Sequence, residues 1–458
     1  MTRQTSANTD GEPTASGQTQ TFGPLTRIAA NASRLVVGTA FVFSGFVKAI
    51  DPLGTQYKMQ DYLQAMQLAG LMPDWLTLLM AVMLAALEFS LGVFAVLAIR
   101  RRAVARLLLA LMMVMTAFTV WIAVADPVED CGCFGDAIHL TNTQTLLKNI
   151  VLLACTAVMA RVPLAMYRFV SKPTQWIAIN FTVLFILLTS IYCLWYLPLF
   201  DFRPYHIGVN IPAGMAIPDG AEQPQFETTF VMEKDGKRQT FTADNYPDST
   251  WQFIDSKTVM TKQGYVPPIH DFSIERADGD DITEEVLAHK GYTFLLIAPH
   301  LEQADDSNFG SIDQIYEYAQ EQHIPFYCLT ASTEEAIQHW EDITGAEYPF
   351  CLTDETTLKT IIRSNPGLLL VNDGTIIRKW SHNGLPDTDT LHGPLGQLEI
   401  GRAPEESAAK TIGEVALWFF MPLLLLVVAD RTWAWSLYVR RKIRKGEQML
   451  HKANANNG

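Results

Sequence analysis

The fold is decided by the stretch Leu107-Leu-Leu-Ala-Leu-Met-Met-Val-Met-Thr-Ala-Phe-Thr119, which contains no charged residue and continues as apolar sequence to Ala125. An α-helix needs about 20 predominantly apolar residues to cross the hydrocarbon core of a bilayer. Stretches of the same kind lie on both sides, and we predict six membrane spans: 32–50, 75–99, 104–125, 144–166, 175–198 and 411–430. This number of apolar runs favours a membrane bundle over a set of buried soluble helices.

The distribution of Arg and Lys predicts the orientation of these spans. Basic residues gather before the first span, between the second and third, between the fourth and fifth, and after the sixth: Arg27 and Arg34; Arg100, Arg101, Arg102 and Arg106; Arg161, Arg168 and Lys172; Arg431, Arg440, Arg441, Lys442, Arg444 and Lys445. Because such clusters stay in the cytoplasm, we expect both termini there, with loop 51–74, the loop after the third span and segment 199–410 facing outward. The pattern is typical of a multi-pass bacterial inner-membrane protein, with the lipid bilayer as a partner.

The remaining segments complete the predicted domain organisation. A chain of 458 residues is too long for one ordinary domain. We predict a disordered cytoplasmic tail (1–30), a four-helix membrane domain (31–170), a fifth span (171–200), an extracytoplasmic β-rich linker (201–265), an α/β domain (266–405), a sixth span (411–432) and a basic cytoplasmic tail (433–458). The net charge of −14 comes mostly from the outer domain and gives no support to nucleic-acid binding.

Two of the six cysteines lie in the loop Asp130-Cys131-Gly132-Cys133-Phe134-Gly135, between the third and fourth spans. A disulfide between residues two apart closes a small, strained ring, and strain makes a disulfide easier to reduce. Gly132 tolerates the tight backbone that this ring needs. We therefore predict Cys131 and Cys133 as catalytic residues in thiol–disulfide chemistry. A structural clamp of the loop and a metal site are the alternatives; too few further ligands are near for us to predict a metal.

Other residues near this loop are candidates for supporting roles. His139 is a possible proton acceptor, and Thr141-Asn-Thr-Gln144 predicts a capping box whose helix dipole offsets the nearby carboxylates. Cys193, near the outer end of the fifth span, is a candidate resolving thiol, while Cys155 lies deeper in the fourth span. For both of these cysteines, apolar packing is the plainer interpretation.

Two ionisable residues fall inside the predicted spans. Glu88 lies near the middle of the second span, where a carboxylate must be protonated or paired. It is either a proton relay or contact for a quinone-like ligand, or an interhelical hydrogen bond that holds the bundle together. Lys48 lies near the outer end of the first span, where it either extends to the lipid headgroups or contacts the cysteine loop.

These motifs together resemble the DoxX-like membrane proteins, and in particular their methylamine-utilisation MauE-like branch. The resemblance is carried by Ser44-Gly45…Lys48…Asp51-Pro52, by Glu88…Gly92, and by Cys131-Gly-Cys133-Phe-Gly135 ahead of Lys148-Asn149, and it covers about residues 30–165. It implies a four-helix bundle linked to extracytoplasmic redox or cysteine chemistry. The fifth span, the outer domain and the sixth span are additions to the simple form.

The outer half alternates strand and helix patterns. Residues 226–234 and 237–243 flank Asp235-Gly236 and predict a hairpin. Beyond it we predict strands at 292–299, 325–330 and 348–352, helices at 307–322, 332–344 (capped by Ser332) and 356–364, and a terminal hairpin at 366–371 and 375–380. This order predicts a βαβ unit followed by an antiparallel pair.

The region 265–400 resembles the thioredoxin-like domains tethered outside bacterial membranes. The resemblance rests on the strand–helix order, a lead-in strand near His270-Asp271-Phe272, and Asn365-Pro366 before the last hairpin. It implies that Pro366 is cis. The Cys-x-x-Cys of that family is missing, since the corresponding stretch is Pro299-His300-Leu-Glu-Gln-Ala-Asp-Asp306. His300 marks either a relict site or an ordinary surface loop, and without a thiolate this domain cannot perform thioredoxin chemistry alone.

Cys328 and Cys351 fall on two strands of the outer domain that are expected to be neighbours. They form either a structural disulfide in an oxidising compartment or two buried small apolar side chains. The predicted fold class is thus an α-helical membrane bundle, with a four-helix core plus two further spans, and an extracytoplasmic α/β thioredoxin-like domain.

Two functional hypotheses of different classes follow. In the first, Cys131 and Cys133 transfer electrons between an extracytoplasmic thiol protein and a membrane acceptor such as a quinone, which would make the chain a thiol–disulfide or quinone-linked oxidoreductase. In the second, the chain is a non-catalytic scaffold or assembly factor whose outer domain binds a client. A transporter is less favoured because no span shows paired Gly or Pro interruptions.

Overall fold

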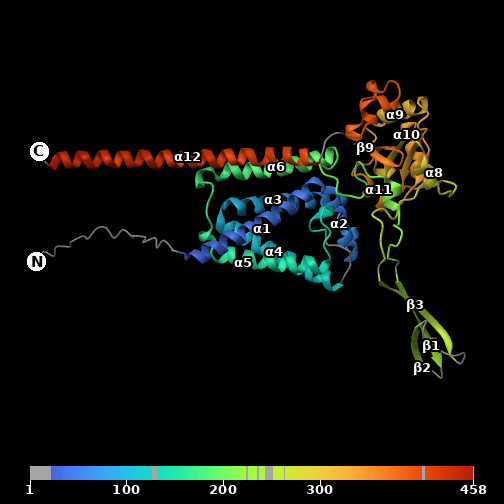
Figure 1. Ribbon diagram of the computed structural model, residues 1–458, viewed down its shortest axis with the longest axis horizontal. Helices are drawn as coiled ribbons and strands as arrows, with labels where there is room; N and C mark the ends of the chain where they lie inside the picture. Colours follow the sequence, from blue (N-terminus) through green and yellow to red (C-terminus); the bar gives the residue numbers. More distant parts are fainter. Residues whose placement is uncertain are drawn as a thin grey trace, which may run out of the picture.

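The structure, a computed structural model, describes residues 22–125, 132–222, 225–234, 237–242, 251–262, 264–404 and 408–456. In these residues six helices are long and apolar enough to cross a membrane, as expected from the six apolar runs. They are α1 (Pro24–Ile50), α3 (Asp74–Leu97), α4 (Arg101–Ala125), α5 (Asn142–Arg161), α6 (Gln175–Trp195) and α12 (Ala408–Asn456). Figure 1 shows them side by side, with a mixed α/β domain and a small separate sheet at one end, and the first residues of α1 and the last residues of α12 at the other.

Helix α1 lies at the centre of the bundle, in contact with α3, α5 and α6, and α12 lies against α6. The approach of α1 to α3 depends on glycine. A Cβ atom on Gly45 would lie 2.3 Å from the backbone nitrogen of Phe89, and one on Gly92 would lie 2.6 Å from the backbone nitrogen of Val42. Small residues at such positions let two helix backbones pack closely in a membrane, where the lipid supplies no hydrophobic drive for association.

Several predicted boundaries are wrong. Helix α1 begins at Pro24, where proline suits the first turn of a helix, so the end of the predicted disordered tail is helical; residues 1–21 lie outside the described residues. Helix α5 ends at Arg161, ahead of Pro163, and α6 ends at Trp195. Helix α12 continues to Asn456, so the predicted basic tail extends the last span as a helix.

The loop at 51–74 contains a helix that the sequence patterns did not predict. Helix α2 (Pro52–Ala65) starts directly after α1, and the side chain of Asp51 caps it by accepting a hydrogen bond from the backbone of Gly54. Its mixed polar composition hides it from a search for apolar runs. It places Asp51 and Tyr57 at the end of the bundle that faces the mixed domain.

The mixed domain has one six-stranded sheet in the order β4-β7-β6-β5-β8-β9. Its strands are β4 (Glu275–Arg276), β5 (Tyr292–Ala298), β6 (Phe326–Thr330), β7 (Phe350–Leu352), β8 (Gly367–Asn372) and β9 (Thr375–Ser381), and its helices are α8 (Thr283–Ala288), α9 (Phe309–Glu321), α10 (Glu334–Thr344) and α11 (Glu355–Ile361). Strands β5, β6 and β7 are parallel, and β8 and β9 are antiparallel, in agreement with the predicted order. The lead-in strand begins at Glu275 rather than near Phe272.

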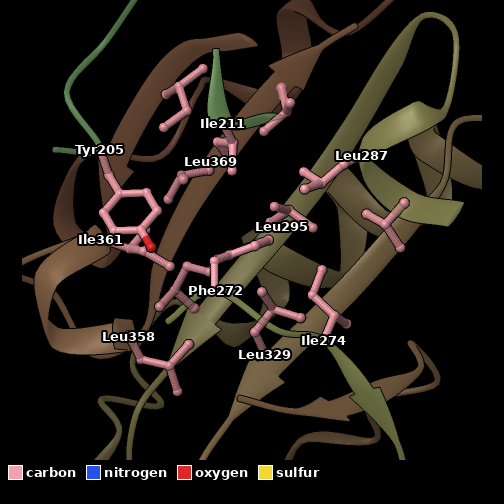
Figure 2. Packing of buried hydrophobic residues seen from close by; sticks show 14 of the residues in the cluster. Tyr205, Ile211, Phe272, Ile274, Leu287, Leu295, Leu329, Leu358, Ile361 and Leu369 are labelled. Carbon is pink, nitrogen blue, oxygen red and sulfur yellow. The ribbon is translucent and has the colours of Figure 1, made fainter. Parts of the chain in front are cut away.

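Both faces of this sheet are buried. Helices α9 and α10 cover one face, and α8, α11 and the short helix α7 (Ile211–Met215) cover the other, which Figure 2 shows with Leu295, Leu329 and Leu369 pointing into it. The predicted cap of α10 at Ser332 is wrong. Thr333 is the cap residue, and the Ser332 hydroxyl instead accepts from the backbone of Leu301.

Of the two alternatives for Cys328 and Cys351, a disulfide is not formed, because both thiols are free. Strands β6 and β7 do lie side by side, but Cys328 is opposite Phe350 and Cys351 is opposite Leu329. Successive side chains of a strand point to opposite faces of a sheet. Cys328 therefore packs among the residues under α9 and α10, and Cys351 packs on the other face. Each behaves as a small apolar residue, and burial raises the pKa of the Cys328 thiol.

A second sheet of order β2-β1-β3 projects away from the bundle and the mixed domain (Figure 1). Strands β1 (Gln225–Lys234) and β2 (Lys237–Thr242) pair antiparallel and confirm the predicted hairpin. Strand β3 (Gln252–Lys262) pairs with the other edge of β1 and was not predicted. The segment 201–265, predicted to be rich in β-structure, therefore contains this three-stranded sheet together with the short helix α7.

Candidate functional site

A buried ion pair joins α1 to α3 beneath the cysteine loop. Lys48 lies in the last turn of α1, and Glu88 lies in the second half of α3. The distance from Lys48 Nζ to Glu88 Oε2 is 2.6 Å. The two residues are only 6% and 3% exposed. A charged group at this depth is costly unless it is paired and hydrogen-bonded. The lysine and the carboxylate each supply the charged partner that the other one needs.

The ion pair also holds the cysteine loop. Ser44 lies one turn before Lys48 on the same face of α1, and its hydroxyl is 2.7 Å from Glu88 Oε2 and 2.8 Å from the main-chain oxygen of Cys133. Lys48 Nζ donates to Ser44 Oγ at 2.8 Å and to the same Cys133 oxygen at 3.1 Å. We call Ser44, Lys48, Glu88 and the Cys133 carbonyl the Lys48 cluster.

The Lys48 cluster decides between the alternatives left open by the sequence. Lys48 does not extend to the headgroups; it points inward and contacts the loop. Glu88 forms the interhelical contact expected of a structural residue. Its two partners, Ser44 and Lys48, also contact the main-chain oxygen of Cys133. One buried set of polar groups therefore serves both the packing of α1 on α3 and the position of the loop.

The Cys133 side chain borders a small cavity of about 40 Å³, more than one water molecule requires. Its lining comes from α1, α3, α4, α5 and the loop: Ala40, Phe41, Ser44, Lys48, Glu88, Met112, Met115, Cys133, Phe134, Lys148, Asn149 and Leu152. The Lys148 ammonium lies 4.2 Å from the centre of the Phe134 ring. Lys48, Glu88 and Lys148 thus line the same cavity as Cys133.

The local backbone of the loop fits its sequence. Gly132 and Gly135 have φ angles of +58° and +52°, in the left-handed region that glycine adopts without strain. On the far side of the loop, Thr141 and Gln144 form the predicted capping box at the start of α5. The capped helix begins next to the loop, where its dipole favours negative charge.

The structure brings together only some of the candidate residues. Lys48, Glu88 and Cys133 meet at one cavity, and Cys131 lies outside the described residues. His139 is exposed, and it is not among the residues that line the cavity. Cys193 is buried on α6, while the cavity is lined from α1, α3, α4 and α5. The sequence analysis gave no role to Ser44 or Lys148, although the one-turn spacing of Ser44 and Lys48 is a signal for the former.

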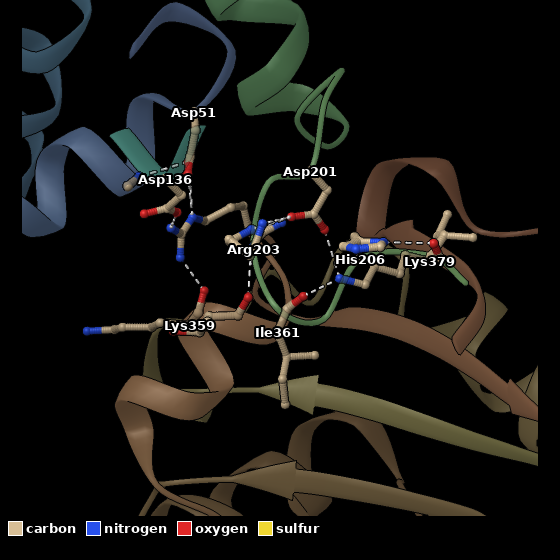
Figure 3. Close-up of polar contacts among 12 residues, drawn as sticks. Asp51, Asp136, Asp201, Arg203, His206, Lys359, Ile361 and Lys379 are labelled. Atoms are coloured by element: carbon tan, nitrogen blue, oxygen red, sulfur yellow. Dashed lines mark hydrogen bonds and ion pairs between the residues drawn. The ribbon is translucent and has the colours of Figure 1, made fainter. Parts of the chain in front are cut away.

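A second set of charges docks the mixed domain on the bundle. Arg363, just after α11, places its Nε 3.0 and 3.1 Å from the two carboxylate oxygens of Asp51 and its Nη2 3.4 Å from Asp136 Oδ2. Its guanidinium also lies 5.3 Å from the centre of the Tyr57 ring, and the Lys359 ammonium lies 4.9 Å from the same ring. We call Arg363 with Asp51, Asp136 and Tyr57 the Arg363 clamp. Figure 3 shows Asp51, Asp136 and Lys359 at this junction.

The Arg363 clamp acts on its two carboxylates differently. Burial alone would raise the pKa of Asp51, but the charges of Arg363 and Arg203 outweigh it and lower that pKa. Burial raises the pKa of Asp136, and Arg363 compensates only in part at its longer distance. Asp136 lies three residues after Cys133, in the turn Gly135–Ala137. The clamp therefore connects the mixed domain to the loop that carries the cysteines.

A neighbouring ion triad fixes the segment that leads from α6 into the mixed domain (Figure 3). Asp201 Oδ1 lies 2.7 Å from Arg203 Nε, and Asp201 Oδ2 lies 2.9 Å from Lys379 Nζ on β9. Burial would raise the pKa of Asp201, but Lys379 and Arg203 lower it to about 2. Asp201 is therefore ionised at neutral pH, and the triad fastens the segment after α6 to the sheet.

The loop after β5 places His300 at one edge of the mixed domain, next to Glu355 and Asn365. His300 Nε2 lies 2.9 Å from Glu355 Oε1, and the amide of Asn365 donates to the His300 carbonyl at 2.7 Å. The Asn365–Pro366 peptide bond is cis, the geometry that the resemblance implies. The loop after β5 contains no thiol, so any thiol chemistry of this chain must come from elsewhere.

Comparison with known protein families agrees with part of this picture. Residues 26–162 match the family model of the methylamine utilisation protein MauE, which covers α1 to α5 and therefore the whole Lys48 cluster. The chain thus contains a MauE-like membrane region. Residues 226–263, which include β1, β2 and β3, match a domain of unknown function (DUF8463). No curated protein matches the chain.

Proposed function

We propose that the MauE-like region is a thiol–disulfide oxidoreductase of the bacterial inner membrane, with Cys131 and Cys133 as its redox couple. The basic clusters favour an orientation with the cysteine loop and the mixed domain outside and both termini in the cytoplasm. In this orientation the couple meets extracytoplasmic thiols on one side and the membrane on the other.

The observation that carries the proposal is the double support of the Cys133 carbonyl by Lys48 and Ser44, within a cavity that two lysines border. A loop that only connects two helices needs no buried ion pair beneath it. A cysteine that reacts needs a fixed backbone and nearby positive charge, because the thiolate is the nucleophile. Both features are present at Cys133.

The reaction is a two-electron exchange. In one half, the disulfide of the couple accepts two electrons and two protons from a pair of partner thiols, which become a disulfide. In the other half, the two thiols of the couple pass two electrons and two protons to a quinone, which becomes a quinol, and the couple becomes a disulfide again. The direct chemistry is attack of a thiolate on a disulfide sulfur.

The mixed domain in this proposal is a thioredoxin-like domain that has lost its own redox pair and now orients the partner protein. Its support is the strand order, the cis bond before Pro366 and the thiol-free loop after β5. The Arg363 clamp holds this domain next to Asp136 and hence next to the cysteine loop.

Differential alkylation tests the proposal. Membranes containing the full chain are labelled with one maleimide before reduction and with a heavier one after it, with and without a quinone pool. We expect Cys131 and Cys133 to change labelling together as the pool is oxidised or reduced, while Cys155, deeper in α5, does not respond. A couple that keeps one redox state under every condition excludes the oxidoreductase.

A scaffold function is the second candidate, and the thiol-free loop of the mixed domain favours it. In that case the outer domains bind a client and the bundle is an anchor. Replacing Cys131 and Cys133 by serine separates the two: a folded variant that retains full function indicates a scaffold, and a folded variant without function indicates redox chemistry. Cys155→Ser serves as the matched control.

A further inference from the structure

A cluster of arginines lies at the end of the bundle opposite the mixed domain. Three helices and one loop contribute to it: Arg34 from α1, Arg101 from α4, Arg168 from the loop before α6, and Arg431 from α12. Arg34 donates to the carbonyl of Tyr167, Arg101 to those of Leu164 and Met166, and Arg431 to those of Arg168 and Phe169. The loop is thus surrounded by guanidinium groups from three sides.

These four arginines have no ion-pair partner among the residues that the structure describes. The acid beside Arg431 is Asp430, whose carboxylate is occupied by hydrogen bonds from Ser171, at 2.5 and 2.9 Å, and Thr174, at 2.6 Å. Arg34 is only 4% exposed, yet its Nε has no acceptor. An unpaired buried guanidinium nitrogen is unfavourable, and an anion at this place would satisfy it.

An apolar groove of about 710 Å³ leads to this cluster between α1, α3, α6 and α12. Phe169 lines the groove, and the Arg34 guanidinium lies 5.0 Å from the centre of the Phe169 ring. Along α12 the lining runs from Ile412 to Val427, about 22 Å at 1.5 Å per residue. That length exceeds one leaflet, about half of the ~30 Å hydrocarbon core.

We propose that this groove is a binding site for one anionic phospholipid of the leaflet on the arginine side, with an acyl chain in the groove and the phosphate at Arg34 and Arg168. The groove alone would take any hydrocarbon chain, and the arginines alone would take a free phosphate. An anionic lipid uses both, as basic pockets between membrane helices commonly do. Arg suits the phosphate because its donors match the phosphate oxygens in pairs.

The lipid would also complete the contact between α12 and the rest of the bundle. Helix α12 lies against α6 and touches α3 at Phe419, whose ring centre lies 5.1 Å from that of Phe89, while the groove opens between α12, α1 and the rest of α3. An acyl chain there replaces missing helix–helix packing. The arginines lie at the end of the bundle away from the cysteine loop, whereas the groove extends to Phe43, whose ring centre lies 5.4 Å from that of Phe134 in that loop.

Native mass spectrometry of the purified full chain tests the site. The chain is titrated with dioleoylphosphatidylglycerol or with dioleoylphosphatidylcholine, and the affinity is taken from the fraction that holds one lipid. We expect tighter binding of the anionic lipid. Each removed arginine, in Arg168→Gln and in Arg34→Gln/Arg168→Gln, should weaken it about fivefold without affecting the neutral lipid. Arg168 is half-exposed, so its single variant remains informative if the double variant does not fold.

Two further variants separate the sources of binding. Ala416→Trp fills the groove and should weaken both lipids, whereas Arg106→Gln removes an exposed arginine outside the cluster and should change nothing. Equal affinity of the wild-type chain for the two lipids refutes the proposal, as does an equal effect of Arg106→Gln and Arg168→Gln. Full displacement by inorganic phosphate combined with an unaffected Ala416→Trp variant would show a simple anion site instead.

Discussion

Replacing Lys48 by methionine should both destabilise the bundle and loosen the loop that carries Cys133. Methionine keeps the length and apolar stem of the side chain but removes the ammonium. Glu88 then lies at 3% exposure with only the Ser44 hydroxyl as a partner, and the Cys133 carbonyl loses one of its two donors.

The magnitude follows from the burial of the pair. Removing one partner of a buried ion pair costs about 3–5 kcal/mol, because the other charge is left uncompensated. Replacing both partners by apolar residues of similar volume is often neutral. We therefore expect Lys48→Met to lower the free energy of unfolding by about 3–5 kcal/mol, and Lys48→Met/Glu88→Leu to recover most of that loss.

The assay combines unfolding and thiol labelling. The free energy of unfolding is measured in mixed micelles titrated with a denaturing detergent, and the alkylation rate of Cys133 is measured in a Cys131→Ser background. Lys148→Met is the matched control. It borders the same cavity but contributes a cation–π contact of only about 0.5–1 kcal/mol. Faster alkylation of Cys133 should accompany Lys48→Met and persist in the double variant, since the loop still lacks its donor.

Two results would refute this reasoning. If Lys48→Met and Lys148→Met destabilise the chain equally, the Lys48–Glu88 pair has no special role. If the double variant is no more stable than Lys48→Met, the loss does not come from an uncompensated Glu88 charge.

Three further predictions concern the outer junction and the helix contact. Arg363→Gln leaves Asp51 without its charged partner, so it should lower the free energy of unfolding by about 3 kcal/mol and raise hydrogen exchange in α2. Arg378→Gln on β9 should have neither effect, because the Arg378 guanidinium lies 3.9 Å from an exposed carboxylate. Equal exchange in the two variants argues against the clamp. The pKa of Asp201 in the folded chain is lowered to about 2, so the stabilising effect of its charge is complete above about pH 4. The free energy of unfolding should fall by about 2 kcal/mol as the pH falls towards 2. An Asp201→Asn variant should lack this acid-dependent loss in a pH series of unfolding curves. Gly45→Ala forces α1 away from α3 and should lower the stability of the chain in thermal unfolding by about 1–3 kcal/mol. Gly413→Ala should not destabilise the chain, because Gly413 has open space around it. An unaffected Gly45→Ala variant would disprove the close helix contact.

The sequence predicted the local features well, because each depends on neighbouring residues. The six apolar runs give the helices that can cross a membrane, the Thr141–Gln144 capping box forms, and the Asp235-Gly236 hairpin pairs as expected. The boundaries failed where helices continue past the apolar run, as α12 does to Asn456. Helix α2 and strand β3 were missed because neither has a strong periodic pattern of its own.

Whether Cys328 and Cys351 form a disulfide depends on information that the sequence of one strand does not contain. The sequence correctly suggests that the strands of Cys328 and Cys351 are neighbours, but their register decides which face each thiol occupies. A shift of one residue exchanges the faces. Whether two cysteines on adjacent strands meet is therefore a question of register, which neither strand encodes alone.

By itself the sequence determined how many helices can enter a membrane, where the positive charge lies, and that the mixed domain carries no thiol after β5. Only the tertiary structure decided that Lys48 turns inward to Glu88 and holds the Cys133 carbonyl, and that Arg363 reaches Asp51 across 312 positions of the chain. The physical reason is one of range. Chain entry into lipid depends on the composition of one segment, whereas the pairing of two distant charges depends on how whole helices and sheets pack against each other.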